Sequence, residues 1–106
     1  RRDLRRIKAE LINSRSRILV PLQSRISEVE DTISQLEQRI DQDTQALIEV
    51  SVKWDGESIK RLNKSIHEST GKIESLFDEL EVLTDELVAK SREFEERLEA
   101  MKETGG

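Results

Sequence analysis

Two hydrophobic stripes constrain the fold of this chain more than any other feature of its sequence. Their members recur at alternating steps of four and three residues, the spacing of a coiled-coil seam. The first stripe consists of Leu22, Ile26, Val29, Ile33, Leu36, Ile40, Asp43, Leu47, Val50 and Trp54. The second consists of Ile59, Leu62, Ile66, Ser69, Ile73, Leu76, Leu80, Leu83 and Leu87. The sequence therefore predicts two long amphipathic helices.

Each stripe has one polar interruption, and the positions of these interruptions predict how the helices pair. If the chain folds back at Asp55-Gly56, the numbers of opposing residues sum to 112 or 113, as for Leu36 with Leu76. In this register Asp43 faces Ser69. A polar residue in a seam helps to fix register, so two facing ones favour pairing within the chain. The predicted fold is all-α, an antiparallel two-helix coiled-coil hairpin with a short helical segment before Pro21.

The segment boundaries follow from the residues that interrupt helices. A single coiled-coil domain is expected over residues 1–106, with a basic N-terminal helix at 1–20, a first arm at 22–54, a turn at 55–57 and a second arm at 58–102. Pro21 lacks an amide hydrogen and should kink or end the first helix. Gly56 can adopt the left-handed backbone found at helix ends. Trp54 is expected to cover the end of the seam.

The N-terminal helix should pack on the second arm. Its apolar residues form a stripe of Leu4, Ile7, Leu11 and Ile18. The predicted register continues past Pro21 and places Phe94 near Leu19, and Met101 near Leu11 or Ile12. Because the chain starts with a charged residue and no methionine, it is expected to be a piece of a longer protein.

Charge is distributed unevenly along the chain. The net charge is −5, but residues 1–25 hold eight basic and two acidic residues, and the remaining 81 residues have a net charge of −11. Such a basic segment attracts polyanions. Since no aromatic residue is interleaved with the cations, contact with a phosphate backbone is favoured over base stacking. The candidate nucleic-acid-binding residues are Arg1, Arg2, Arg5, Arg6, Lys8, Arg15, Arg17 and Arg25. Alternatively, the acidic C-terminal segment lies beside them and neutralises them.

The sequence lacks the residues of a catalytic or metal site. There is no cysteine, and the one histidine, His67, follows a seam residue and should lie in solvent. Neither a nucleophile beside a base nor a glycine-rich phosphate loop occurs. We therefore expect no enzyme activity, no cofactor, no metal and no small-molecule ligand. No segment approaches the ~20 apolar residues of a membrane span, so no membrane partner is expected.

Most of the N-terminal helix and part of the first arm resemble a known family. The segment RRIKAELINSRSRILVPLQSRISEVEDTISQLEQRI, residues 5–40, resembles the C-terminal domain of ABC-F ATPases, especially the Uup type. The matching positions are Ala9-Glu10, Asn13, Pro21-Leu22, Ile26, Glu30, Ile33 and Leu36-Glu37. The chain departs from the family pattern at Ile12, where arginine is frequent, and at Val20, where lysine is common. Both departures lower the basic charge.

The resemblance implies a coiled-coil tail that follows two ATPase modules. Full-length proteins of the family hydrolyse ATP and act on ribosomes, and Uup-type tails are associated with DNA binding. For this chain, the resemblance implies DNA or ribosomal RNA as partners, together with the nucleotide-binding modules of the same parent chain. The absence of cysteine favours a cytoplasmic location. The alternative function is a structural spacer or protein-interaction coiled coil without nucleic-acid binding.

Overall fold

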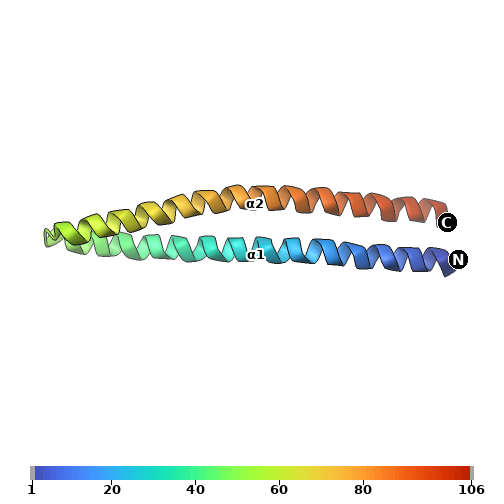
Figure 1. Ribbon diagram of the computed structural model, residues 1–106, viewed down its shortest axis with the longest axis horizontal. Helices are drawn as coiled ribbons and strands as arrows, with labels where there is room; N and C mark the ends of the chain where they lie inside the picture. The colour runs from blue at the N-terminus through green and yellow to red at the C-terminus, as the bar shows by residue number, and fades with distance from the viewer. Residues whose placement is uncertain (1, 106) are drawn as a thin grey trace. The chain divides into compact units, whose positions relative to one another are not determined.

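Two long helices account for nearly the whole chain. The computed structural model describes the backbone of residues 2–105 and the side chains of residues 2–103. Helix α1 spans Arg2–Val52 and helix α2 spans Gly56–Gly105, and a short turn joins them (Figure 1). No strand occurs within residues 2–105. The prediction of an all-α helical hairpin is confirmed.

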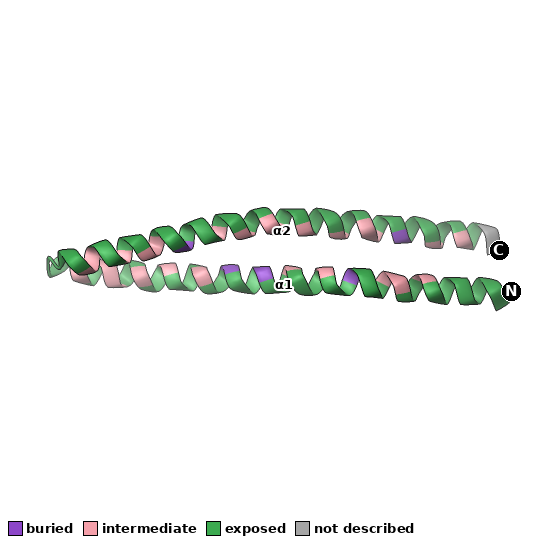
Figure 2. Ribbon diagram, in the orientation of Figure 1, coloured by how far each residue is buried: buried purple, intermediate pink, exposed green. Residues whose placement is uncertain are grey.

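The seam between the helices contains the residues that the spacing predicted. Every stripe residue from Leu22 to Val50 in α1 and from Ile59 to Leu87 in α2 is buried or half-buried (Figure 2). Val29 and Ile33 are only 1% and 5% exposed, and Ser69 is 4% exposed. The step of three and four places these side chains on one face of each helix, where the partner helix covers them. Burial on a single face explains how a chain with few apolar residues can fold.

The hairpin divides into two compact units. One comprises residues 28–80 and contains the turn together with the helix segments on either side of it. The other joins the start of α1, up to Ser27, to the end of α2 from Glu81 onward. Each unit therefore contains a segment of both helices. The expectation of one domain over residues 1–106 stays a prediction.

Helix α1 continues through Pro21, which corrects the predicted boundary between residues 20 and 22. The helix runs for 51 residues with Pro21 in its interior. Pro21 is exposed, while Leu19 is buried and Leu22 is half-buried. Water at the exposed face can therefore replace the amide that proline cannot offer to the preceding turn. Leu19 and Leu22, on either side of Pro21, both lie in the seam, so the same face of α1 stays buried before and after the proline.

The turn lies at residues 53–55, two residues earlier than predicted, and α2 begins at Gly56 instead of residue 58. The amide of Trp54 donates to the carbonyl oxygen of Ser51 at 3.3 Å, and the amide of Asp55 donates to that of Val50 at 3.2 Å. These two hydrogen bonds form a Schellman motif. The left-handed residue of the motif is Trp54, with φ of 59°, and not Gly56.

The side chain of Asp55 caps the start of α2, and the neighbouring Trp54 lies in solvent. Asp55 Oδ1 accepts a hydrogen bond from the amide of Ser58 at 3.2 Å, and Asp55 Oδ2 accepts one from the Ser58 hydroxyl at 2.7 Å. Asp55 is thus the N-cap of α2. The side chain of Trp54 is 89% exposed. The expectation that Trp54 covers the end of the seam is wrong, because its left-handed backbone directs the ring away from the helix pair.

The seam in the N-terminal part of α1 differs from the predicted stripe. Leu19 is 6% exposed, whereas Ile18 is 42% exposed, and Leu4 and Ile7 are exposed as well. The seam positions are instead Leu11, Arg15, Leu19 and Leu22, with two successive steps of four. Helix α2 has the same two steps between Lys90, Phe94 and Leu98. Such a stutter shifts the local repeat from 3.5 toward 3.6 residues per turn, and it occurs in both helices of this unit.

Candidate nucleic-acid interface

The basic segment begins on an exposed stretch of α1. All residues from 2 to 10 are exposed, and they include the candidate cations Arg2, Arg5, Arg6 and Lys8. Arg17 and Arg25 are also exposed, and Arg15 is half-buried in the seam. Arg1 lies outside the described residues. Six of the eight candidate side chains are therefore exposed to solvent, whereas Arg15 is half-buried in the seam.

Contacts within α1 hold some of these side chains. Arg6 pairs with Asp3 at 3.8 Å and with Glu10 at 3.9 Å, and its side chain is still 71% exposed. Arg17 Nε donates to the carbonyl oxygen of Asn13 at 3.5 Å. Exposed ion pairs of this kind contribute at most about 1 kcal/mol and are easily exchanged for other partners. They leave the guanidinium groups accessible to a polyanion.

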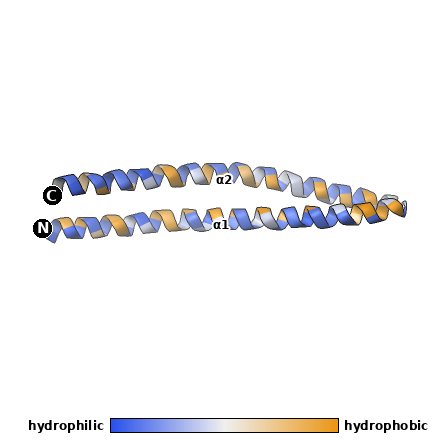
Figure 3. Ribbon diagram, turned by 180° about the vertical axis from the view of Figure 1, so that it is seen from behind, coloured by the Kyte–Doolittle hydropathy of each residue, from blue (hydrophilic) through white to orange (hydrophobic). Residues whose placement is uncertain are grey.

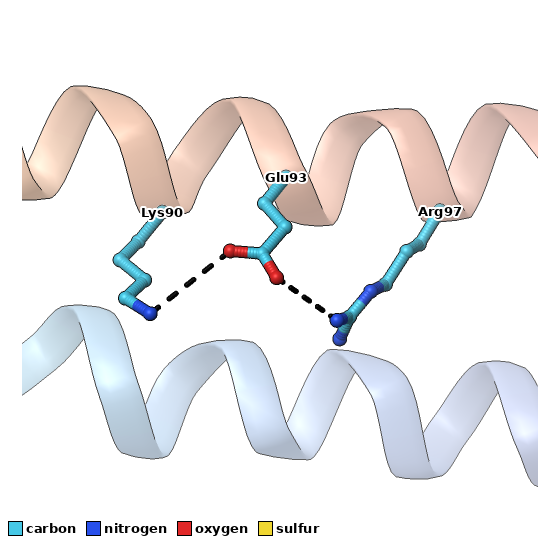
Figure 4. Close-up of polar contacts among 3 residues, drawn as sticks. All are labelled: Lys90, Glu93 and Arg97. Carbon is cyan, nitrogen blue, oxygen red and sulfur yellow. Dashed lines mark hydrogen bonds and ion pairs between the residues drawn. The ribbon is translucent and has the colours of Figure 1, made fainter.

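The acidic residues of α2 form no direct ion pair with the first arginines of this segment, as far as residues 2–103 show. Within that range, no ion pair joins Arg2, Arg5 or Arg6 to an acidic side chain of α2. The end of α2 forms its own pairs instead, from Glu93 to Lys90 at 4.0 Å and to Arg97 at 2.9 Å (Figure 4). The acidic end of α2 thus lies in one compact unit with the basic segment, as the alternative expected, but it forms no direct ion pair with these three arginines within residues 2–103.

The same cluster covers a large apolar side chain. The guanidinium of Arg97 lies 5.7 Å from the centre of the Phe94 ring, and Phe94 is 3% exposed. Lys90 occupies a seam position and is half-buried, while its ammonium reaches Glu93. The cluster thus stabilises the packing of Phe94 and uses cations that belong to α2 alone.

The polar layer of the seam has a different partner from the one predicted. Ser65 Oγ donates a hydrogen bond of 2.7 Å to Asp43 Oδ2. The expected partner was Ser69, which is buried. Ser65 lies one helical turn nearer to the turn of the hairpin, and the Asp43 side chain leans toward it. This hydrogen bond joins α1 to α2 within the unit of residues 28–80, so the polar layer contributes to the structure of the hairpin.

A metal or ligand site would need suitable side chains among the described residues. In the part of the chain that the structure describes, no group of three or more His, Cys, Asp or Glu side chains is placed to hold a metal ion. An open groove beside Gly71 is lined by Thr32, Leu36, Glu68, Lys72, Ser75 and Leu76. His67 is exposed. None of these residues forms an arrangement with evident chemistry.

A second cationic surface, which the sequence prediction missed, lies around the turn. We call it the tip surface and define it as Lys53, Trp54, Lys60, Arg61 and Lys64, all of which are exposed. Residues 53–64 have a net charge of +2, whereas residues 26–52 and 65–106 have net charges of −6 and −7. Dividing the chain into only two charge blocks hid this segment. A shorter window along the sequence would have found it.

The chain matches no protein-family model, no curated protein and no solved structure. Its resemblance to the ABC-F family therefore stays a prediction. Neither helix, over its described residues, is long and apolar enough to cross a membrane.

Proposed function

We propose that this chain is a non-catalytic nucleic-acid-binding coiled coil, the tail of an ABC-F ATPase in the cytoplasm. The basic segment would contact DNA or ribosomal RNA through the phosphate backbone, without reading the base sequence. The observation that carries this proposal is the exposure of Arg2, Arg5, Arg6 and Lys8 on the first turns of α1. The ion pairs of Arg6 are weak and lie within α1.

The arrangement supports electrostatic contact in preference to sequence recognition. A bidentate hydrogen bond to a base edge needs a side chain held in a defined orientation. The cations of the basic segment are long, exposed and without a supporting packed surface. Phosphate contact requires only a dense positive charge, and four cations within residues 2–8 supply it. The nucleotide-binding modules expected in the parent protein would direct the tail to its nucleic acid.

Charge substitution tests this function. Replacing Arg2, Arg5, Arg6 and Lys8 with glutamine should weaken binding to duplex DNA and structured RNA to a similar extent for different base sequences. The slope of log K against log salt should flatten by up to about 0.9 for each phosphate that the variant no longer binds. Fluorescence anisotropy with labelled nucleic acids at several salt concentrations measures both effects.

A matched control variant changes the net charge by the same amount as the test variant. Arg39, Lys72, Arg92 and Lys102 are four exposed cations outside both the basic segment and the tip surface. Replacing these four with glutamine should leave most of the binding intact. Equal loss in both variants would mean that only total charge matters. A lower melting temperature without any binding by the unmodified chain would support the structural-spacer alternative.

A further inference from the structure

The hairpin turn exposes an aromatic side chain at a strained backbone position. Trp54, the only tryptophan of the chain, is 89% exposed and has φ of 59°. A large side chain rarely adopts this left-handed conformation, and glycine is usual at this place in a Schellman motif. Trp54 therefore adds little to the packing of the hairpin and occupies a site that glycine would stabilise. Strained residues of this kind are often kept for a function.

Four cations lie within ten residues of Trp54 in the sequence. Lys53 precedes Trp54 directly, and Lys60, Arg61 and Lys64 follow on one face of α2 because of their i, i+1, i+4 spacing. All four are exposed, and among the described residues none of the four takes part in an ion pair. At 1.5 Å per residue, the farthest of them, Lys64, lies about 12 Å along α2 from its start. This length matches a few phosphates of a single strand.

We propose that the tip surface is a second nucleic-acid contact, in which the Trp54 ring stacks on an unpaired base and Lys53, Lys60, Arg61 and Lys64 bind the adjoining phosphates. Single-stranded nucleic acid is bound by this combination of an exposed aromatic ring with nearby cations. The positive charge fits its partner, since residues 53–64 have a net charge of +2 between two segments, 26–52 and 65–106, that are negative overall. This contact does not depend on the basic segment at the start of α1.

An unpaired base fits the tip better than an apolar pocket or a lipid core does. Apolar residues continue up to the turn (Figure 3), and Val52 and Ile48 are 77% and 63% exposed. However, Asp55 follows Trp54 directly and caps α2 through Ser58. The same two hydrogen bonds keep the pKa of Asp55 below its ordinary value, so it stays charged. Burying the whole tip would remove this charge from water, whereas stacking uses only one face of the ring.

The fluorescence of Trp54 provides a direct test, because no other tryptophan contributes. A short single-stranded thymidine oligonucleotide should quench this fluorescence in a saturable way, and a duplex of the same length should quench it much less. In anisotropy titrations with the labelled single strand, Trp54→Ala should weaken binding by about 5- to 150-fold, the loss that removal of one stacked base implies. Replacing the four tip cations with glutamine should weaken binding and flatten its salt dependence.

Two controls separate this proposal from the proposed function. Phe77 is another exposed aromatic residue of the same unit, 52% exposed, and Phe77→Ala should leave single-strand binding unchanged. The glutamine variant of Arg2, Arg5, Arg6 and Lys8 should fail to bind duplex and should keep the quenching of Trp54. Retained quenching without duplex binding would thus confirm two separate contacts.

Three results would overturn the proposal. The first is the absence of quenching by the single strand at low salt. The second is equal quenching and equal competition by inorganic polyphosphate, which would show an electrostatic contact without stacking. The third is a blue shift of Trp54 emission with vesicles of anionic phospholipid but no response to the oligonucleotide, which would assign the tip to a lipid surface.

Discussion

Replacing Trp54 with glycine should stabilise the hairpin, although it removes the largest side chain of the molecule. The left-handed backbone costs an L-residue roughly 1–2 kcal/mol, and Trp54 has φ of 59°. Glycine avoids this cost but loses more conformational freedom on folding, which offsets roughly 0.5–1 kcal/mol of the gain. A ring that is 89% exposed has almost no burial to lose. The expected net gain is about 0.5–1 kcal/mol.

Circular dichroism can measure this gain in stability. Tryptophan fluorescence cannot, because the variant lacks the only tryptophan of the chain. For a domain of about 100 residues, the gain corresponds to a rise in melting temperature of about 2–8 °C. Trp54→Ala is the matched variant, because alanine lacks the ring but keeps a Cβ at the strained position. Its stability should stay close to that of the unmodified chain, so the difference between the two variants isolates the backbone cost. Melts at two protein concentrations would separate folding from association.

If Trp54→Gly were no more stable than Trp54→Ala, the reasoning would be refuted. Residue 54 would then not be left-handed in solution, because both variants lack the ring and differ only in how well they tolerate that backbone. The same variant connects stability to the tip surface. We expect Trp54→Gly to be more stable and to bind single-stranded nucleic acid more weakly, an exchange that is common at functional sites.

Three further predictions concern the helices. Pro21→Ala should raise the free energy of unfolding by up to about 3 kcal/mol, because Pro21 is in a helix interior and removes a backbone hydrogen bond; urea unfolding measures this. Gly71→Ala should raise it by roughly 0.5–1 kcal/mol, since an added Cβ would meet no atom within 4 Å and α2 is helical there. Asp55→Ala should lower the melting temperature at neutral pH, whereas Asp55→Asn should nearly preserve it, because the amide oxygen can also cap the helix. The Ser58 hydroxyl and amide lower the pKa of Asp55 below 3.8, so the cap stabilises the fold above that pH and weakens as the pH falls through the native pKa.

Each of these predictions has a result that contradicts it. Unchanged stability of Pro21→Ala would show that α1 is already distorted at this position. A loss of stability in Gly71→Ala would mean that the groove around it is filled by a contact with another molecule. For the cap, the comparison runs between the unmodified chain and Asp55→Asn from pH 6 down to pH 2. Parallel loss of stability in both proteins would show that other carboxylates cause the whole acid effect.

Local residue patterns were sufficient to predict the helices and the seam. The spacing of three and four residues predicted the buried face of each helix from Leu22 to Val50 and from Ile59 to Leu87, and all these residues are buried or half-buried. The reason is that helical geometry alone decides which residues share a face. Facing polar residues then predicted the hairpin. The proposed nucleic-acid contacts also began from sequence, as a block of basic residues.

Other features depended on contacts between the helices. The apolar stripe favoured Ile18 for the seam, whereas the register placed Leu19 near Phe94; the contacts between the helices bury Leu19 and Phe94 and leave Ile18 exposed. Ser65 binds Asp43 instead of Ser69, since side-chain reach across the seam is not encoded in residue spacing. Likewise, no spacing rule shows that the apolar side chains of Leu4 and Ile7 are exposed.

The sequence by itself determined that this chain forms two amphipathic helices, where they fold back and which face of each is buried, because these properties follow from local periodicity and turn residues. Only the tertiary structure decided that α1 passes through its proline and that a tryptophan takes the left-handed position at the turn. It also decided that Arg2, Arg5 and Arg6 form no ion pair with α2 among the described residues. These properties depend on how packing against a second helix offsets a local cost, and a single helix cannot reveal that balance.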